Sequence, residues 1–180
     1  MSSSPEADGC PVFWFSGLSG AGKTTVAEAV SADLKSRGLT VVIFDGDDVR
    51  RNRKSPLGFS RRHVLINNAE MAALCRAGRG RADAILVPII SPYRLGRARA
   101  RAVIGHGFHE IYFSADQQCV AARDAKGLYA QAARGPIPPM IGFSHASPYA
   151  PPPTPDPWRP NHLSACGQRE CRPVSGQHWS

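Results

Sequence analysis

The sequence has no long apolar run and no regular cysteine pattern. No stretch of its 180 residues approaches the roughly 18 uninterrupted apolar residues that a membrane-spanning helix requires. Residues 1–8 are polar and acidic, unlike a secretory signal, which is basic and then apolar. The five cysteines show neither C-x-x-C spacing nor a histidine pair at zinc-finger distance, so we expect reduced thiols that pack in the interior. These absences predict a cytoplasmic protein with no membrane partner.

Acidic and aromatic side chains are few beside the basic ones. The chain has 22 Lys and Arg against 14 Asp and Glu, for a formal net charge of +8. Such a surplus can indicate nucleic-acid binding, but no aromatic residues interleave with the basic clusters as a base-stacking surface requires. We therefore expect no nucleic-acid partner and assign the charge mainly to a polyphosphate pocket. The alternative is that the arginines lie on solvated helix faces. The clusters are Arg50, Arg51, Arg53 and Lys54, and Arg94, Arg97, Arg99 and Arg101.

The most informative motif is Gly-Leu-Ser-Gly-Ala-Gly-Lys-Thr at residues 17–24, which fits the phosphate-loop pattern G-x-x-x-x-G-K-[ST]. In such a loop, backbone N–H groups and the N-terminus of the following helix bind phosphates. Lys23 is predicted to reach the β- and γ-phosphates, and Thr24 to bind Mg²⁺. The motif follows an apolar run and precedes a helical pattern, which disfavours the alternative of a glycine turn with an incidental lysine. It predicts binding of a nucleoside triphosphate.

Apolar runs alternate with helical patterns over residues 12–113. The predicted strands are Val12–Ser16, Val41–Phe44, Ala84–Ile90 and Glu110–Phe113. One predicted helix ends at Arg37 before Gly38, one runs from the N-cap Ser60 to Ala77, and one follows Pro92. This order predicts an α/β fold with a parallel sheet covered by helices on both faces. Functional residues then gather at the carboxyl ends of the strands.

Three polar clusters follow predicted strands. In Asp45-Gly46-Asp47, Asp47 is the preferred group to accept a proton or position Mg²⁺, although both carboxylates could instead cap the next turn or helix. Ser91 begins the second cluster, which either holds an anion or caps a helix. The third cluster, residues 123–129, contains Arg123 and Lys126 and predicts a basic lid, with a solvated helix end as the alternative.

The motifs, with Leu57-Gly58-Phe59-Ser60 and Ser147-Pro148-Tyr149, occur in the order found in adenylylsulfate kinases. The chain resembles this family from about Val12 to Pro153. The resemblance implies a P-loop NTPase fold: a three-layer α/β structure with a mostly parallel sheet flanked by helices and a small lid. The implied reaction uses ATP and Mg²⁺ to phosphorylate the 3'-hydroxyl of adenosine 5'-phosphosulfate, giving 3'-phosphoadenylylsulfate in sulfate activation. A homodimer is expected from the family alone.

The resemblance also implies roles for individual residues. Phe59 would stack on adenine, Arg50 would meet the phosphosulfate, and Lys126 would bridge the two substrates. Ser91 matches a serine described in the family as forming a phosphoenzyme, but in-line transfer needs no such intermediate, so we favour a positioning role. The implied catalytic residues are Lys23, Asp47 and Ser91. The ATP-binding residues are Gly17, Leu18, Ser19, Gly20, Ala21, Gly22, Lys23, Thr24, Thr25 and Arg123, with Thr24 as metal ligand. The substrate-binding residues are Asp45, Arg50, Phe59, Asn67, Ile90, Ser91, Lys126 and Leu128.

The sequence departs from the family at His63 and Val64, where the family has Asp-Arg. Loss of a charge-assisted contact to sulfate or phosphate costs about 1.5 to 3 kcal/mol. Either Arg61 or Arg62 substitutes from the neighbouring positions, or the acceptor is another nucleotide or phosphorylated metabolite. A relative that binds ATP without catalysis is the third alternative.

The chain divides into three predicted parts: a flexible N-terminus at 1–10, a kinase domain at 11–153 with its lid at about 123–140, and a proline-rich tail at 154–180. The tail offers neither an apolar strand nor a helix, so we expect it to be disordered. A frameshift that replaced the family's last strand and helix is one hypothesis, and a natural proline-rich tail is the other.

Overall fold

The computed structural model describes residues 9–54, 57–115, 120 and 149–153. Its strands and helices, in chain order, are β1 (Val12–Gly17), α1 (Lys23–Ser36), β2 (Val41–Ile43), α2 (Gly46–Arg51), α3 (Arg61–Gly78), the 3-10 helix η1 (Arg79–Arg81), β3 (Ala84–Pro88), α4 (Arg94–Ile104) and β4 (Phe108–Phe113). The predicted lid, the predicted tail and Arg123, Lys126 and Leu128 lie outside the described residues.

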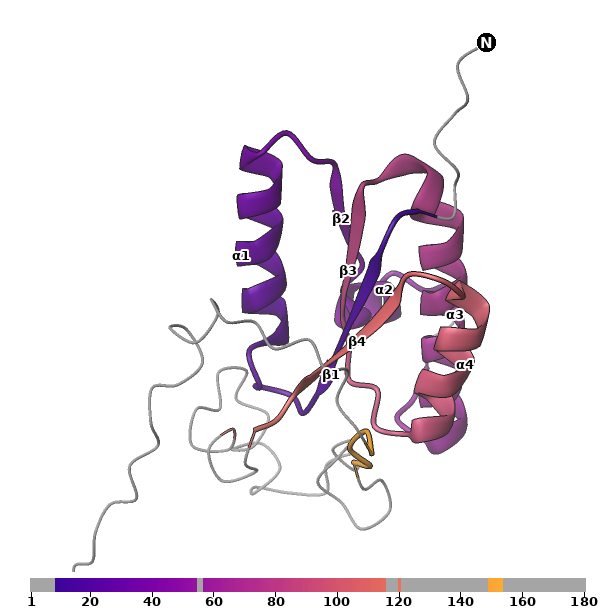
Figure 1. Ribbon diagram of the computed structural model, residues 1–180. Coiled ribbons are helices and arrows are strands. Elements are labelled where there is room, and N and C mark those ends of the chain that lie inside the picture. The colour runs from indigo at the N-terminus through magenta and orange to yellow at the C-terminus, as the bar shows by residue number, and fades with distance from the viewer. Residues whose placement is uncertain (1–8, 55–56, 116–119, 121–148, 154–180) are drawn as a thin grey trace, which may run out of the picture.

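The four strands form one sheet in the order β2-β3-β1-β4, and every pairing between neighbours is parallel. In Figure 1, α1 covers one face of this sheet, while α3 and α4 cover the other. The predicted α/β architecture, with a parallel sheet flanked by helices, is therefore confirmed. Because all strands run the same way, their carboxyl ends lie along one edge of the sheet.

The side chains of β1 and β3 alternate between two cores. Trp14 and Val87 pack with α3 and α4 in one cluster, whereas Phe15 and Leu86 pack on the α1 side in the other. This alternation is the period of two expected for strands, and apolar residues on both faces are typical of a helix-covered parallel sheet. Cys75 is a buried free thiol in the first cluster. Burial raises the pKa of Cys75 to about 12, so this cysteine has the packing role that the sequence predicted.

The ends of several elements differ from the sequence prediction. Strand β3 stops at Pro88, two residues early, and only Ile89 continues the ladder by donating its N–H to the Phe15 carbonyl at 3.0 Å. Strand β4 begins at Phe108, two residues before the predicted start. Helix α2 was not predicted as an element, because six residues are too few to show a helical apolar period. The N-cap Ser60 is confirmed: its side chain accepts from the N–H of His63 at 3.3 Å.

Arg79 joins three chain segments near the amino ends of the strands. Only 5% of this residue is exposed, and its Nε donates to the Cys10 carbonyl at 2.9 Å. Its Nη1 donates to the Ile104 carbonyl at 2.8 Å, and its Nη2 donates to the His106 carbonyl. A single guanidinium therefore satisfies carbonyls at the entry to β1 and at the C-terminal end of α4, where helical carbonyls lack backbone partners.

We expect Arg79→Met to lower the free energy of unfolding by about 3 kcal/mol, because buried carbonyls lose a charged donor. Urea denaturation followed by circular dichroism measures this change. The matched control is Arg81→Met in the same 3-10 helix, where the side chain is exposed and the change should stay within about 0.5 kcal/mol. Equal effects of the two variants would contradict the assignment.

Candidate functional site

The phosphate loop connects the carboxyl end of β1 to the start of α1. Gly17 has a φ of 147°, and a Cβ there would lie 2.7 Å from the Phe113 carbonyl oxygen, so no larger residue fits. Gly22 is the N-cap of α1 and makes no side-chain cap hydrogen bond. The first N–H groups of the helix are therefore not capped by a side chain at this position. This strand-loop-helix geometry is the arrangement that the motif predicted for a phosphate site.

Lys23 is buried inside the curve of the loop. Its Nζ donates to the carbonyls of Gly17 at 3.0 Å and Leu18 at 2.6 Å. These contacts hold the ammonium group beside the loop backbone, where it adds a full positive charge to the partial charges of the N–H groups. The site is therefore strongly attractive to a polyphosphate.

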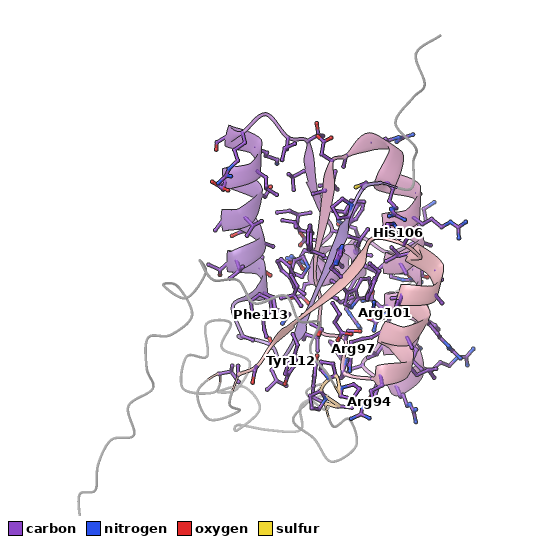
Figure 2. The ribbon with its side chains drawn as sticks, viewed as in Figure 1. Arg94, Arg97, Arg101, His106, Tyr112 and Phe113 are labelled. Atoms are coloured by element: carbon purple, nitrogen blue, oxygen red, sulfur yellow. The ribbon has the colours of Figure 1, made fainter. Side chains whose placement is uncertain are left out.

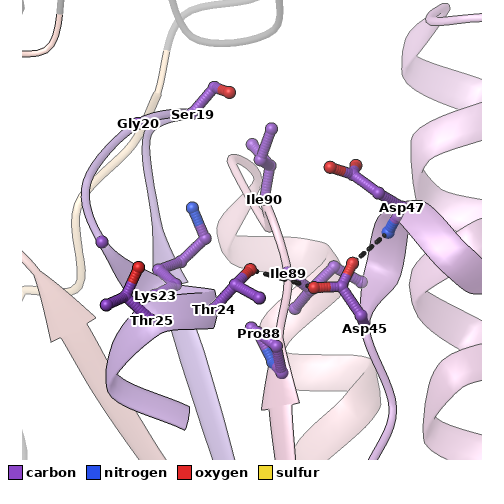
Figure 3. Close-up of a pocket in the computed structure, with 11 residues that line it drawn as sticks. Ser19, Gly20, Lys23, Thr24, Thr25, Asp45, Asp47, Pro88, Ile89 and Ile90 are labelled. Atoms are coloured by element: carbon purple, nitrogen blue, oxygen red, sulfur yellow. Dashed lines mark hydrogen bonds between the residues drawn. The ribbon is translucent and has the colours of Figure 1, made fainter. Parts of the chain in front are cut away.

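Asp45 and Asp47 lie on the side of the pocket opposite Lys23, and Thr24 lies between Lys23 and Asp45 (Figure 3). Asp45 caps α2 by accepting the N–H of Asp47 at 2.8 Å through Oδ1, and its Oδ2 accepts from the Thr24 hydroxyl at 2.9 Å. The capping alternative therefore holds for Asp45, which also links the start of α2 to the start of α1. Asp47, in the first turn of α2, contributes to the pocket wall.

The close approach of α2 to β3 depends on Gly46. A Cβ at this buried position would lie 2.7 Å from the Ile89 Cγ1 atom, which is too close for any side chain. Because glycine has no side chain, the backbone of α2 packs directly on Ile89, the residue that follows β3. This contact sets the position of Asp47 relative to the pocket.

Nine predicted site residues line one pocket, together with Pro88 and Ile89, which the sequence did not single out. Figure 3 shows Ile90 between the phosphate loop and the two aspartates. Ile89 could have been found from its position beside the predicted Ile90 at a strand end. The nine predicted residues are Ser19, Gly20, Gly22, Lys23, Thr24, Thr25, Asp45, Asp47 and Ile90. Gly17, Leu18 and Ala21 belong to the same loop but do not line the pocket.

Arg50 and Phe59 form a second group of predicted residues. The Arg50 guanidinium lies over the Phe59 ring, 4.9 Å from its centroid, and Nη1 donates to the Gly58 carbonyl at 2.8 Å. Burial lowers the pKa of Arg50, and nearby Asp47 opposes that shift. A guanidinium group is a cation in proteins in any case. The structure thus brings together a cation, an exposed aromatic ring and Asp47 on the preceding turn of α2.

Ser91 and Asn67 are both buried. The Ser91 hydroxyl accepts from Asn68 Nδ2 at 2.6 Å, and Ser91 does not line the pocket, a placement more suited to positioning than to nucleophilic attack. The Oδ1 atom of Asn67 has no hydrogen-bond partner among the described residues. Val64 is 1% exposed, so the position where the family has an arginine is part of the interior.

The arginine cluster after Ser91 does not line the pocket, contrary to the polyphosphate interpretation. Arg94 and Arg99 are exposed on α4, as the solvated-face alternative predicted, whereas the Arg101 guanidinium lies over the Phe108 ring, 4.7 Å from its centroid. Arg97 is buried and lies in an ion pair with Glu110. Sequence analysis missed Glu110 because nothing local in the sequence marks a contact between helix α4 and strand β4.

No helix within the described ranges combines the length and apolarity that crossing a membrane requires.

Comparisons with known proteins point to one family. The family model for adenylylsulphate kinase matches residues 9–157. An adenylyl-sulfate kinase of Halothermothrix orenii is 44% identical over 147 residues, covering 79% of this chain and 76% of that protein. One of Paraburkholderia xenovorans is 39% identical over 133 residues, covering 74% of each chain. The solved structure of the Mycobacterium tuberculosis APS kinase in complex with AMPPNP and APS superposes with a TM-score of 0.74 at 35% identity, covering 81% of this chain and 85% of that one.

We expect Asp45→Ala to destabilise the fold by about 1 kcal/mol, because α2 loses its cap and Thr24 loses its acceptor. Chemical denaturation monitored by tryptophan fluorescence tests this. The control is Asp48→Ala in the same helix, which removes an exposed ion pair with Arg51. It should change the free energy of unfolding by less than about 0.5 kcal/mol. A larger loss for Asp48→Ala would show that Asp45 is not the cap on which α2 depends.

Proposed function

The chain belongs to the adenylylsulphate kinase family, and on that premise we propose that it transfers the γ-phosphate of ATP to the 3'-hydroxyl of adenosine 5'-phosphosulfate. Members of this family are phosphotransferases, and the P-loop NTPase fold of this chain supplies the nucleotide site. The observation that carries the proposal is the pocket that joins the phosphate loop to Asp47. One wall suits a triphosphate, and the other offers a carboxylate to an acceptor hydroxyl.

On the donor side, the loop N–H groups and Lys23 bind the phosphates of ATP. Because phosphoryl transfer spreads negative charge over the γ-phosphate oxygens, fixed positive charge beside them stabilises the transition state. Lys23 emerges from the first turn of α1, so its ammonium group and the helix N-terminus act on the same anion.

The residues of the pocket fit Mg²⁺. A hydroxyl from Thr24 and carboxylates from Asp45 and Asp47 are oxygen donors in one pocket. In the part of the chain that the structure describes, no group of three or more His, Cys, Asp or Glu side chains could hold a metal. Mg²⁺ keeps several waters and binds through one or two protein groups plus substrate phosphates, so the oxygen donors of this pocket suit it. Bound there by Thr24, the ion would neutralise charge on the β- and γ-phosphates.

On the acceptor side, we assign Asp47 to accept the proton of the 3'-hydroxyl and Arg50 to bind the phosphosulfate. Phe59 lies under the Arg50 guanidinium and is 42% exposed, so its ring offers a surface for adenine stacking. A donor group on the substrate would satisfy the unpartnered Oδ1 of Asn67. Ser91 positions the segment after Ile90 through its bond with Asn68.

Arg61 is our candidate to replace the cation absent at Val64. Its guanidinium lies 5.4 Å from the centroid of the Tyr93 ring, so it extends from the start of α3 toward the start of α4. Arg62 is also exposed but has no such placement among the described contacts. If Arg61 does not compensate, a related small kinase with another phosphorylated acceptor is the second candidate function.

We also propose a setting for the enzyme. A cytoplasmic location agrees with the free thiols Cys10 and Cys75, since reducing compartments keep cysteines unpaired. The product of the proposed reaction is an activated sulfate donor, and we propose that it serves sulfate assimilation. A homodimer is the assembly that we propose from the family.

We expect the protein to transfer label from γ-labelled ATP to adenosine 5'-phosphosulfate in the presence of Mg²⁺. Lys23→Ala should reduce that transfer at least about 100-fold, because it removes a charge from the phosphate site. The control is Lys35→Ala, an exposed lysine near the end of the same helix, which should retain full activity. Transfer to a different nucleotide would favour the second candidate function. ATP binding without transfer to any acceptor in a nucleotide panel would identify a catalytically impaired relative.

We expect Arg61→Ala to raise the KM for adenosine 5'-phosphosulfate about tenfold, the lower end of a lost charge-assisted contact, with little change in the KM for ATP. Arg62→Ala, one residue along and equally basic, should change either KM less than about twofold. Steady-state kinetics with each substrate varied in turn measures both. Indistinguishable variants would refute Arg61 as the replacement.

A further inference from the structure

A buried ion pair lies between α4 and β4, outside the pocket. Arg97 Nε and Glu110 Oε1 are 2.7 Å apart, and the two side chains are 3% and 12% exposed. Figure 2 shows Arg97 directed from α4 toward the sheet, while Arg94 lies at the start of the helix. Burying two charges carries a desolvation cost that their attraction often fails to recover, so stability alone is a weak reason for such a pair.

On one side, the pair connects to the phosphate loop. Glu110 Oε1 accepts from the Ser16 hydroxyl at 3.2 Å, and Ser16 is fully buried. Ser16 immediately precedes Gly17, where the loop begins. The carboxylate thus fixes the residue from which the phosphate loop departs.

On the other side, the pair connects to the segment that follows β3. Arg97 Nη1 donates to the Ser91 carbonyl at 2.6 Å, and Nη2 donates to the Ala150 carbonyl at 2.6 Å. The N–H of Ala150 in turn donates to the Pro92 carbonyl at 2.9 Å. Ser91 follows Ile90, which lines the pocket between the loop and Asp47. The planar guanidinium therefore binds acceptors on three separate segments: the Glu110 carboxylate and the carbonyls of Ser91 and Ala150. No apolar side chain could make these contacts.

We propose that the Arg97–Glu110 pair positions the phosphate loop relative to the Ile90–Ser91 segment of the transfer site. Arg97 and Glu110 are positioning residues: they contact no substrate, but hold the phosphate loop, through Ser16, in register with the Ile90–Ser91 segment. This inference rests on the proposed function, because in-line transfer loses about 100-fold in rate when reacting groups are displaced by about 1 Å. The pair acts on kcat more than on substrate affinity.

The test separates positioning from stability with the double variant Arg97→Met/Glu110→Leu. Apolar replacements of similar size remove both buried charges together, although the Ser91 and Ala150 carbonyls lose their donor, so this variant is expected to be less stable than the wild type but still folded under the assay conditions. Its kcat should fall at least about 30-fold, while the KM for ATP changes less than about threefold. Arg99→Met, an exposed arginine on the same helix, is the control and should keep the wild-type kcat.

Hydrogen–deuterium exchange provides a readout that needs no acceptor. Peptides covering residues 16–22 and 89–92 should exchange faster in the double variant, with other sheet peptides unchanged. A stable double variant with wild-type kcat and wild-type exchange would overturn the proposal.

Ser16→Ala keeps the test decisive if the double variant does not fold. It removes the hydrogen bond from the loop entry to Glu110, and we expect a fall in kcat of about five- to tenfold with faster exchange over residues 16–22. Wild-type values for both would overturn the proposal. If the wild-type protein fails to phosphorylate adenosine 5'-phosphosulfate, the proposed function fails, while the exchange measurements still decide the positioning role.

Discussion

The parallel pairing of β1 with β3 and β4 is the constraint on which the site depends. In its register Phe15 lies opposite Pro88 and Gly17 opposite Phe113, so the three strands end at nearly the same level. The backbone pairing alone therefore makes neighbours of the phosphate loop, the Ile89–Ile90 segment and the end of β4. A shift of one residue in this pairing would exchange the two cores and separate the walls of the pocket.

Local signals in the sequence predicted most of the fold and the phosphate-loop side of the site. Ser60 marks a helix start through its own hydroxyl, and Gly38, with a φ of 85°, follows the end of α1. The phosphate loop is likewise contained in eight consecutive residues. Such features depend on neighbours a few positions away, so sequence reasoning can find them.

Contacts between distant segments could not be predicted in this way. Ser16 and Glu110 are 94 positions apart, and nothing in the spacing of Arg94, Arg97, Arg99 and Arg101 distinguishes the buried arginine from the exposed ones. The charge surplus was therefore assigned too broadly to the pocket. Only the packing of α4 against β4 decides that Arg97 meets a carboxylate and Arg101 the Phe108 ring, while Arg94 and Arg99 stay exposed.

The contact between Gly46 and Ile89 has a consequence for how this protein can change over generations. The Ile89 side chain fills the space that a Cβ at position 46 would need. Alanine is therefore tolerated at position 46 only if a smaller residue replaces Ile89. Gly46 lies in α2 and Ile89 just after β3, so we expect these two distant positions to change in size together. Lineages that drift in size at one of them will carry a matching change at the other, or lose the spacing on which the carboxylate of Asp47 depends.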